Sequence, residues 1–106
     1  MNLSMDLSQQ GLHMFFKDWQ VLALQALWGS SEALNSREVC DAINEKTSIS
    51  RASVINFLEA SYENGLLERE TTTGKGGHYG LYTAKYDEQG TKDYLKKLFT
   101  ERLNKL

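Results

Sequence analysis

Four of the eight glycines in this chain lie in one segment, TTTGKGGHYGLY (71–82). A phosphate-binding P-loop is excluded, because it needs a lysine followed by serine or threonine, and here Lys75 is followed by Gly76. The dinucleotide-binding fingerprint would need a third glycine at position 79, where Tyr79 stands. Both motifs also lead directly into a helix, whereas β-forming residues follow here. The segment therefore predicts a β-hairpin whose glycines supply the positive φ angles of a tight turn.

The predicted hairpin follows three predicted helices. Residues 66–73 and 78–86 have the partial apolar–polar alternation of strands. Residues 16–31, 34–48 and 50–65 carry apolar side chains three and four positions apart, which places them on one face of each helix. The chain contains no proline to interrupt these helices.

Polar residues mark the expected helix ends. Asp18 is the predicted N-cap of the first helix, and Ser50 of the third. Asn35 and Glu38 form a capping-box-like pair at the start of the second. Gly65 is expected to end the third helix in a left-handed conformation.

Residues 87–106 predict a fourth helix with a wide apolar stripe. The stripe is wider than a small body needs, so we expect part of it to meet a second copy around a two-fold axis. The alternative is that it folds back entirely on its own domain. Residues 1–15 are predicted to form an arm that packs on the body or on the second subunit. The expected interface residues are Tyr94, Leu95, Leu98, Phe99 and Leu103.

This order of elements is that of a winged helix-turn-helix. The chain resembles the penicillinase-repressor family and, more broadly, MarR-type regulators. The resemblance rests on Trp28 at the end of the first helix, the pattern S-R-x-S-V-x-x-x-L (50–58) and the pattern G-L-L-E-R (65–69). It implies a mainly α fold with a small β-hairpin (α+β), in which residues 16–86 form the winged-helix domain and residues 87–106 a dimerisation helix.

The resemblance also implies a function: a homodimeric, sequence-specific regulator, a repressor, that binds double-stranded DNA. The third helix would enter the major groove and the wing would meet the backbone or minor groove. The expected DNA-binding residues are Ser50, Arg51, Ser53 and Asn56 on the helix and Lys75 and His78 on the wing. Arginine and asparagine pair bidentately with guanine and adenine. For each residue a plainer role is also open, as a helix cap or a solvated side chain.

Charge counts against indiscriminate DNA binding. The net charge is −2, and residues 47–86 hold four basic and four acidic residues. A winged-helix module that binds protein rather than DNA is therefore the alternative function. Salt-sensitive binding to DNA duplexes would distinguish the two.

The sequence predicts no enzyme, cofactor or metal site. It shows no Ser–His–Asp spacing and no paired carboxylates, and its single cysteine, Cys40, is expected to be a buried thiol. His78 is expected to act as a donor rather than a metal ligand, because the chain has only two histidines and no cysteine pair. One cysteine, no signal-peptide pattern and no apolar run of membrane-spanning length together predict a cytoplasmic protein.

Overall fold

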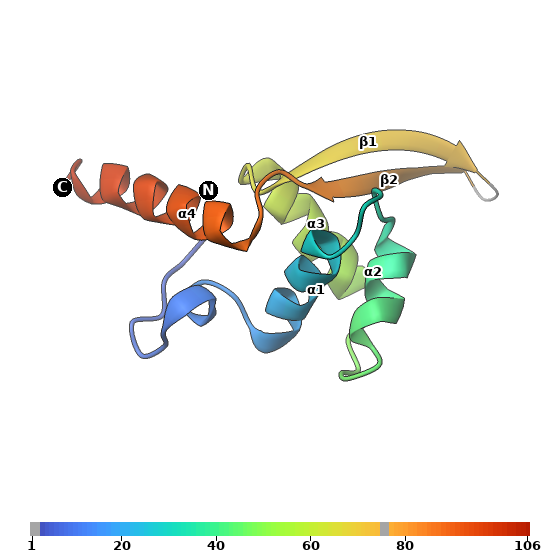
Figure 1. Ribbon diagram of the computed structural model, residues 1–106, viewed down its shortest axis with the longest axis horizontal. Helices are drawn as coiled ribbons and strands as arrows, with labels where there is room; N and C mark the ends of the chain where they lie inside the picture. Colours follow the sequence, from blue (N-terminus) through green and yellow to red (C-terminus); the bar gives the residue numbers. More distant parts are fainter. Residues whose placement is uncertain (1–2, 75–76) are drawn as a thin grey trace.

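The computed structural model describes residues 3–74 and 77–106, which form a winged helix (Figure 1). Within these residues the fold is α+β, with four α-helices and a two-stranded antiparallel hairpin, as the sequence predicts. The elements are a 3-10 turn η1 (Gly11–Met14), helices α1 (Asp18–Trp28), α2 (Ser36–Ile43) and α3 (Arg51–Glu63), strands β1 (Leu67–Gly74) and β2 (Gly77–Ala84), and helix α4 (Glu88–Leu103).

The three helices α1 to α3 form a central bundle, and the hairpin and α4 extend from it in opposite directions. Figure 1 shows the hairpin reaching away from the bundle on one side and α4 on the other. The molecule is accordingly elongated, with extents of 48 × 27 × 23 Å. No helix in the described residues has both the length and the apolar character to cross a membrane. The largest fully buried apolar side chains are Leu24, Val39, Ile43, Val54, Leu58, Leu66 and Leu95.

Two predicted caps are confirmed. The Asn35 side chain accepts a hydrogen bond from the Glu38 backbone N–H (2.8 Å), and the Glu38 carboxylate accepts one from the Asn35 N–H (3.0 Å). Ser50 caps α3 by accepting from the backbone N–H of Ser53 (3.2 Å). Each bond satisfies an amide that the first helical turn leaves unpaired, so the bonds fix where α2 and α3 begin.

The predicted Asp18 cap is wrong. Lys17 occupies the N-cap position of α1, and its backbone N–H donates to the Gln20 side chain (2.8 Å). Asp18 is already the first helical residue, and its carboxylate instead pairs with His13 (3.0 Å). A carboxylate in the first turn still interacts favourably with the helix dipole.

The second helix ends earlier than predicted, at Ile43 rather than near position 48. Asn44 follows it, and its side-chain amide donates to the carbonyl of Ile49 (3.0 Å) while its oxygen accepts from the Ile49 N–H (2.9 Å). These two bonds close the turn between α2 and α3. They link the end of α2 to the residue just before the N-cap of α3, across a connection that contains no other helix or strand.

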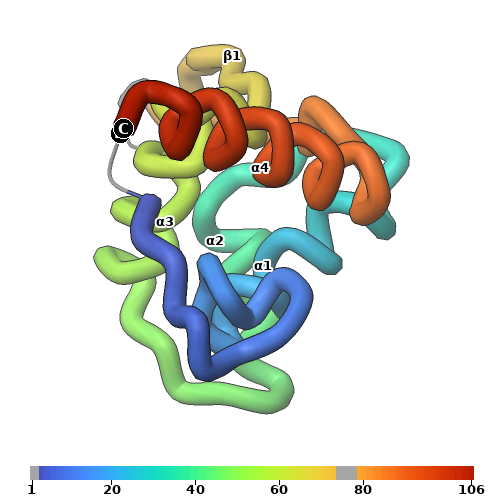
Figure 2. The backbone as a smooth tube through the Cα atoms, turned by 90° about the vertical axis from the view of Figure 1, so that its left-hand side faces the viewer, coloured from blue at the N-terminus to red at the C-terminus, as the bar shows by residue number. Residues whose placement is uncertain are grey.

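The arm before α1 packs on the body of its own chain. Leu12 and Phe16 are buried, and the Phe16 ring meets Phe57 of α3 edge-on at 5.9 Å. The Phe15 ring lies 4.9 Å from that of Phe99 on α4. Figure 2 shows the arm running beside α1 and α3 and beneath α4. Of the two alternatives for the arm, packing on its own body is therefore observed.

Gly65 follows the C-cap residue of α3 and has a φ of +83°, the left-handed conformation that the sequence predicts. The same position also anchors α4. The hydroxyl of Tyr94 on α4 donates to the carbonyl of Asn64 (2.8 Å). A Cβ atom at position 65 would lie 2.6 Å from that hydroxyl oxygen. The glycine therefore serves both the backbone turn and the close approach of α4.

Gly65→Ala should destabilise the fold by ~2 kcal/mol or more, since it adds left-handed strain and displaces the Tyr94 hydroxyl. Gly11→Ala is a matched control, because Gly11 also has a positive φ (+62°) but an added Cβ meets nothing within 4 Å. Urea unfolding of both variants measures the difference. Equal losses in the two variants would contradict the role given to Tyr94. The Gly65→Ala change should also cost less in a Tyr94→Phe background.

Candidate nucleic-acid interface

A groove of about 360 Å³ runs between α3 and the hairpin. Its walls are one face of α3, the first residue of α2, and inward-facing parts of both strands. The residues that define it for the argument below are Arg51, Ile55, Glu59, Arg69, Thr71 and Tyr82. We call this the α3–wing groove.

The predicted helix residues fall into two groups. Arg51 is exposed and lines the α3–wing groove. Ser53 and Asn56 are exposed on α3 but do not line the groove. Ser50 is exposed at the N-cap, and its hydroxyl also donates to the Ser53 hydroxyl (3.0 Å). The capping role that the sequence left open for Ser50 is therefore observed.

Of the two predicted wing residues, Lys75 lies outside the described residues. His78 belongs to β2, where its backbone is paired with Thr73, and its side chain is outside what the structure describes. The strands pair as far as Gly74 and Gly77, so the glycine-rich segment does join the two strands of a hairpin, as the sequence predicts.

The floor of the groove is an ionic network that sequence reasoning missed. Glu59 of α3 accepts from the hydroxyl of Tyr82 on β2 (2.5 Å) through one carboxylate oxygen, and from the guanidinium of Arg69 on β1 through the other. The Arg69 guanidinium also lies over the ring of Tyr62, 4.5 Å from its centroid. In the sequence, Glu59 is only one of the four acidic residues counted over residues 47–86. Its position four residues after Ile55 puts it on the same side of α3 as Ile55, which lines the groove. Its partners are on the two strands, and the spacing of residues within a helix does not predict which strand residues lie opposite it.

The network shifts the protonation equilibria of its members. The hydrogen bond from Tyr82 lowers the pKa of Glu59 below its usual value, and the Arg69 guanidinium lowers it further against the opposing effect of burial. Burial, with the bond to Glu59 and its negative charge, raises the pKa of Tyr82 far above its ordinary value. Glu59 is therefore a carboxylate and Tyr82 a neutral donor at neutral pH.

The acidic residues of the wing, unlike Glu59 of α3, face away from the groove. Strand side chains alternate between faces, and the inward set contains Arg69 and Thr71, both of which line the groove. Glu68 and Glu70 are the alternate, exposed residues of β1. Glu59 is neutralised by Arg69, and none of the ion pairs within the described residues involves Arg51. The groove face is therefore more positive than the even count of charges over residues 47–86 suggests.

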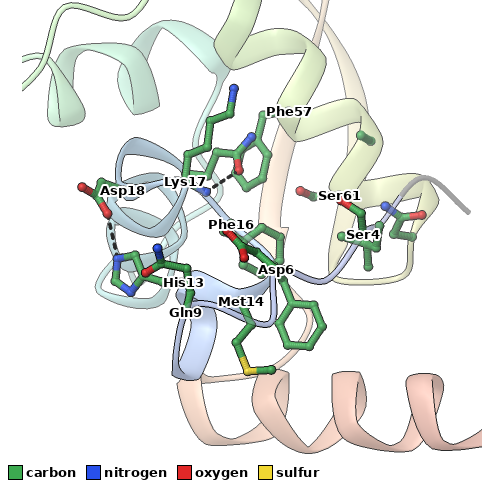
Figure 3. A pocket seen from close by; sticks show the side chains of 15 residues that line it. Ser4, Asp6, Gln9, His13, Met14, Phe16, Lys17, Asp18, Phe57 and Ser61 are labelled. Carbon is green, nitrogen blue, oxygen red and sulfur yellow. Dashed lines mark hydrogen bonds and ion pairs between the residues drawn. The ribbon is translucent and has the colours of Figure 1, made fainter.

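A second, larger hollow of about 700 Å³ lies behind α3, between that helix and the N-terminal arm (Figure 3). Phe57, Ser61 and Asn64 line it, and helical spacing puts them on the side of α3 opposite Arg51 and Ile55. Figure 3 shows His13 of the arm turned toward Asp18 rather than toward α3. In the described part of the chain, no group of three histidine, cysteine or acidic residues could hold a metal ion.

The predicted interface residues of α4 divide along the helix. Leu95 is 1% exposed and belongs to the core of its own chain, so its assignment to a dimer interface is corrected. Tyr94 and Phe99 are half-buried against Asn64 and Phe15 respectively, and Leu98 is half-buried. Leu103 is 57% exposed. The first half of the stripe thus folds back on its own domain, which was the stated alternative.

Comparison with known proteins supports the fold. The winged-helix chain is similar to the solved structure of a possible transcriptional regulator from Methanosarcina mazei Go1, with a TM-score of 0.63 and 11% sequence identity over 85% of this chain and 75% of the other. No family model and no curated protein matches the sequence. At this identity the likeness is one of fold, so the families named from the sequence remain a resemblance.

The lowered pKa of Glu59 makes a prediction for acid stability. A carboxyl whose pKa is lower in the folded state stabilises the fold fully above its unfolded pKa, near the reference value of 4.5, and this contribution is lost as pH falls through the folded pKa. Glu59→Gln removes the titration. Between pH 6 and pH 3 the free energy of unfolding should therefore fall less steeply in the variant than in the unaltered protein. Parallel curves in urea titrations would show that Glu59 has the same pKa in both states.

Proposed function

We propose that this protein is a DNA-binding transcriptional regulator, a repressor, that acts as a homodimer. In this proposal α3 enters the major groove and the hairpin meets the backbone or minor groove. The observation that carries it is the α3–wing groove, in which Arg51 is exposed and without an ion-pair partner among the described residues, while Glu59 is neutralised. The name of the M. mazei structure and the resemblance to penicillinase repressors agree with a regulator.

Within the proposal each residue has a role of its own. Arg51, at the first turn of α3, donates to a guanine edge or a phosphate, and Asn56, five residues further along, pairs with adenine. Ser50 and Ser53 contact phosphates, with Ser50 also holding the helix cap. Lys75 and His78 on the wing add backbone contacts, which raise affinity with little sequence preference.

A protein-binding module is the second candidate function. The observation that favours it is the presence of apolar side chains at the same groove, where Ile55 is 37% and Tyr79 39% exposed. Fluorescence anisotropy with labelled random-sequence and selected duplexes at 50 and 200 mM salt separates the candidates. A DNA-binding protein should lose affinity steeply with salt, because phosphate contacts release counterions. A protein-binding module should show no salt-sensitive duplex binding.

Arg51→Ala should weaken binding to a selected operator by ~1–3 kcal/mol if Arg51 pairs with a guanine edge. Lys97→Ala is the matched control, since it also removes one positive charge from an exposed position, on α4 before the proposed dimer contact and away from the groove. Anisotropy titrations of both variants give the comparison. An Arg51→Ala protein that binds like the Lys97→Ala control removes Arg51 from the set of base contacts.

The proposed dimer uses the last turn of α4 and the residues that follow it. Beyond Phe99 every residue of the helix is exposed, and the large apolar side chains of this end of the chain are Leu103 in the helix and Leu106 after it. A second copy related by a two-fold axis would cover them. Two copies would also double a DNA contact surface that is only modestly charged.

Leu103→Asp should shift the protein toward monomers, by ~1.5–3 kcal/mol per leucine removed from the interface. Thr100→Asp, which adds the same charge at another exposed position of α4, should shift the equilibrium less. Sedimentation equilibrium over a range of concentrations measures both. A Leu103→Asp protein that stays dimeric at low micromolar concentration moves the interface elsewhere.

A further inference from the structure

We propose that Glu59 is a positioning residue that holds the wing at a fixed angle to α3, so that both meet one DNA duplex together. This inference rests on the proposed DNA-binding function and goes beyond it, because Glu59 itself would make no DNA contact. It assigns a use to the one acidic side chain at the floor of the α3–wing groove.

The geometry of the carboxylate is the first argument. One oxygen of Glu59 accepts from Arg69 on β1, and the other accepts from Tyr82 on β2. Arg69 and Tyr82 are direct cross-strand partners in the hairpin register. A single side chain of α3 therefore holds both strands at the same level of the hairpin.

The surroundings of Tyr82 are built for this bond. The Tyr82 ring passes over Gly80, where an added Cβ would lie 3.1 Å from the ring carbon Cζ and from the hydroxyl oxygen. The Tyr82 backbone exchanges two hydrogen bonds with Leu34 in the segment before α2 (2.8 and 2.9 Å). With its backbone fixed on one side and its ring on the other, Tyr82 transmits the position of α3 to β2.

Lever length explains why a contact near the base of the hairpin matters at its far end. Five residues separate Arg69 from Gly74, which corresponds to roughly 17 Å of strand. A rotation of about 10° at Arg69 then displaces the end of the strand by ~3 Å, which is the full length of a hydrogen bond. Loss of the Glu59 contacts should therefore spread the wing over positions that no longer match a duplex already held by α3.

For Glu59→Ala, the proposal and simple electrostatics predict opposite changes in DNA affinity. If Glu59 were only an acidic surface residue, Glu59→Ala would remove a repulsive charge and strengthen DNA binding. As a positioning residue it should instead weaken binding, by roughly fivefold or more. Glu63→Ala is the matched control, because it removes the same charge one turn further along α3 from an exposed side chain outside the groove. It should leave duplex affinity unchanged or slightly higher.

Rescue separates positioning from general damage to the fold. Glu59→Gln keeps an oxygen that accepts from Tyr82 but loses the ion pair with Arg69, so its duplex affinity should lie between those of the Glu59→Ala and unaltered proteins. If Glu59→Ala fails to fold, Tyr82→Phe takes its place, since it removes only the hydroxyl that reaches Glu59. Circular dichroism and thermal unfolding identify the folded variants.

A measurement without DNA tests the wing position directly. Spin labels on Asp41→Cys in α2 and Thr73→Cys in β1, in a Cys40→Ser background, report the distance between the helix-turn-helix and the wing; both labelled positions are exposed. The distance distribution should be narrow in the parent and in Glu63→Ala, and clearly broader in Glu59→Ala. An unchanged distribution in Glu59→Ala, or duplex binding as tight as that of Glu63→Ala, overturns the proposal.

The two readouts keep the failures distinct. If the parent protein shows no salt-sensitive duplex binding, the proposed function fails, yet the spin-label distances still decide whether Glu59 fixes the wing. If the parent binds DNA and the distances do not change in Glu59→Ala, the proposed function stands and the positioning role falls.

Discussion

The arrangement of this protein depends on how Tyr82 is held. Its backbone pairs with Leu34 and its hydroxyl donates to Glu59, so one buried residue joins the segment before α2, the hairpin and α3. A buried tyrosine hydroxyl without a partner would carry a desolvation penalty, which makes the choice of acceptor structurally decisive. Because the acceptor is on α3, the helix and the wing form the two sides of one groove.

The same interaction changes how the charges of the chain should be understood. A net charge of −2 and an even local count suggest a surface with little attraction for nucleic acid. In the folded chain the charge of Glu59 is neutralised by its ion pair with Arg69, while Glu68 and Glu70 lie on the face of β1 that points away from the groove. Arg51 is left to face the groove. The attraction remains modest, which is why the proposed DNA-binding function includes two copies whose contacts add.

Local signals allowed much of the fold to be predicted. The predicted roles of the Asn35–Glu38 pair, Ser50 and Gly65 depend only on backbone groups within a few residues of each, and the structure confirms all of these roles. The pairing of Glu59 with strands ten and 23 residues away depends on tertiary register, which no helix pattern contains.

The misplaced expectation for Leu95 has a related cause. An apolar stripe on a helix shows that something covers it, but not whether the cover is its own domain or a partner. In this chain the arm and the turn at Gly65 reach α4 from distant parts of the sequence, and they contact Phe99 and Tyr94 of the helix respectively. The candidate DNA residues on α3 followed from the resemblance, and the structure adds which of them share the groove.

Amide chemical-shift mapping with a selected duplex is the most direct test of the central claim, that α3 and the wing form one DNA-binding surface. The account predicts salt-sensitive shift changes that include Arg51 and Asn56 on α3 together with Thr71 on β1, while the outer half of α4 and the hollow behind α3 stay unperturbed. Changes confined to α4 or to the arm, or no change at any salt concentration, would contradict it.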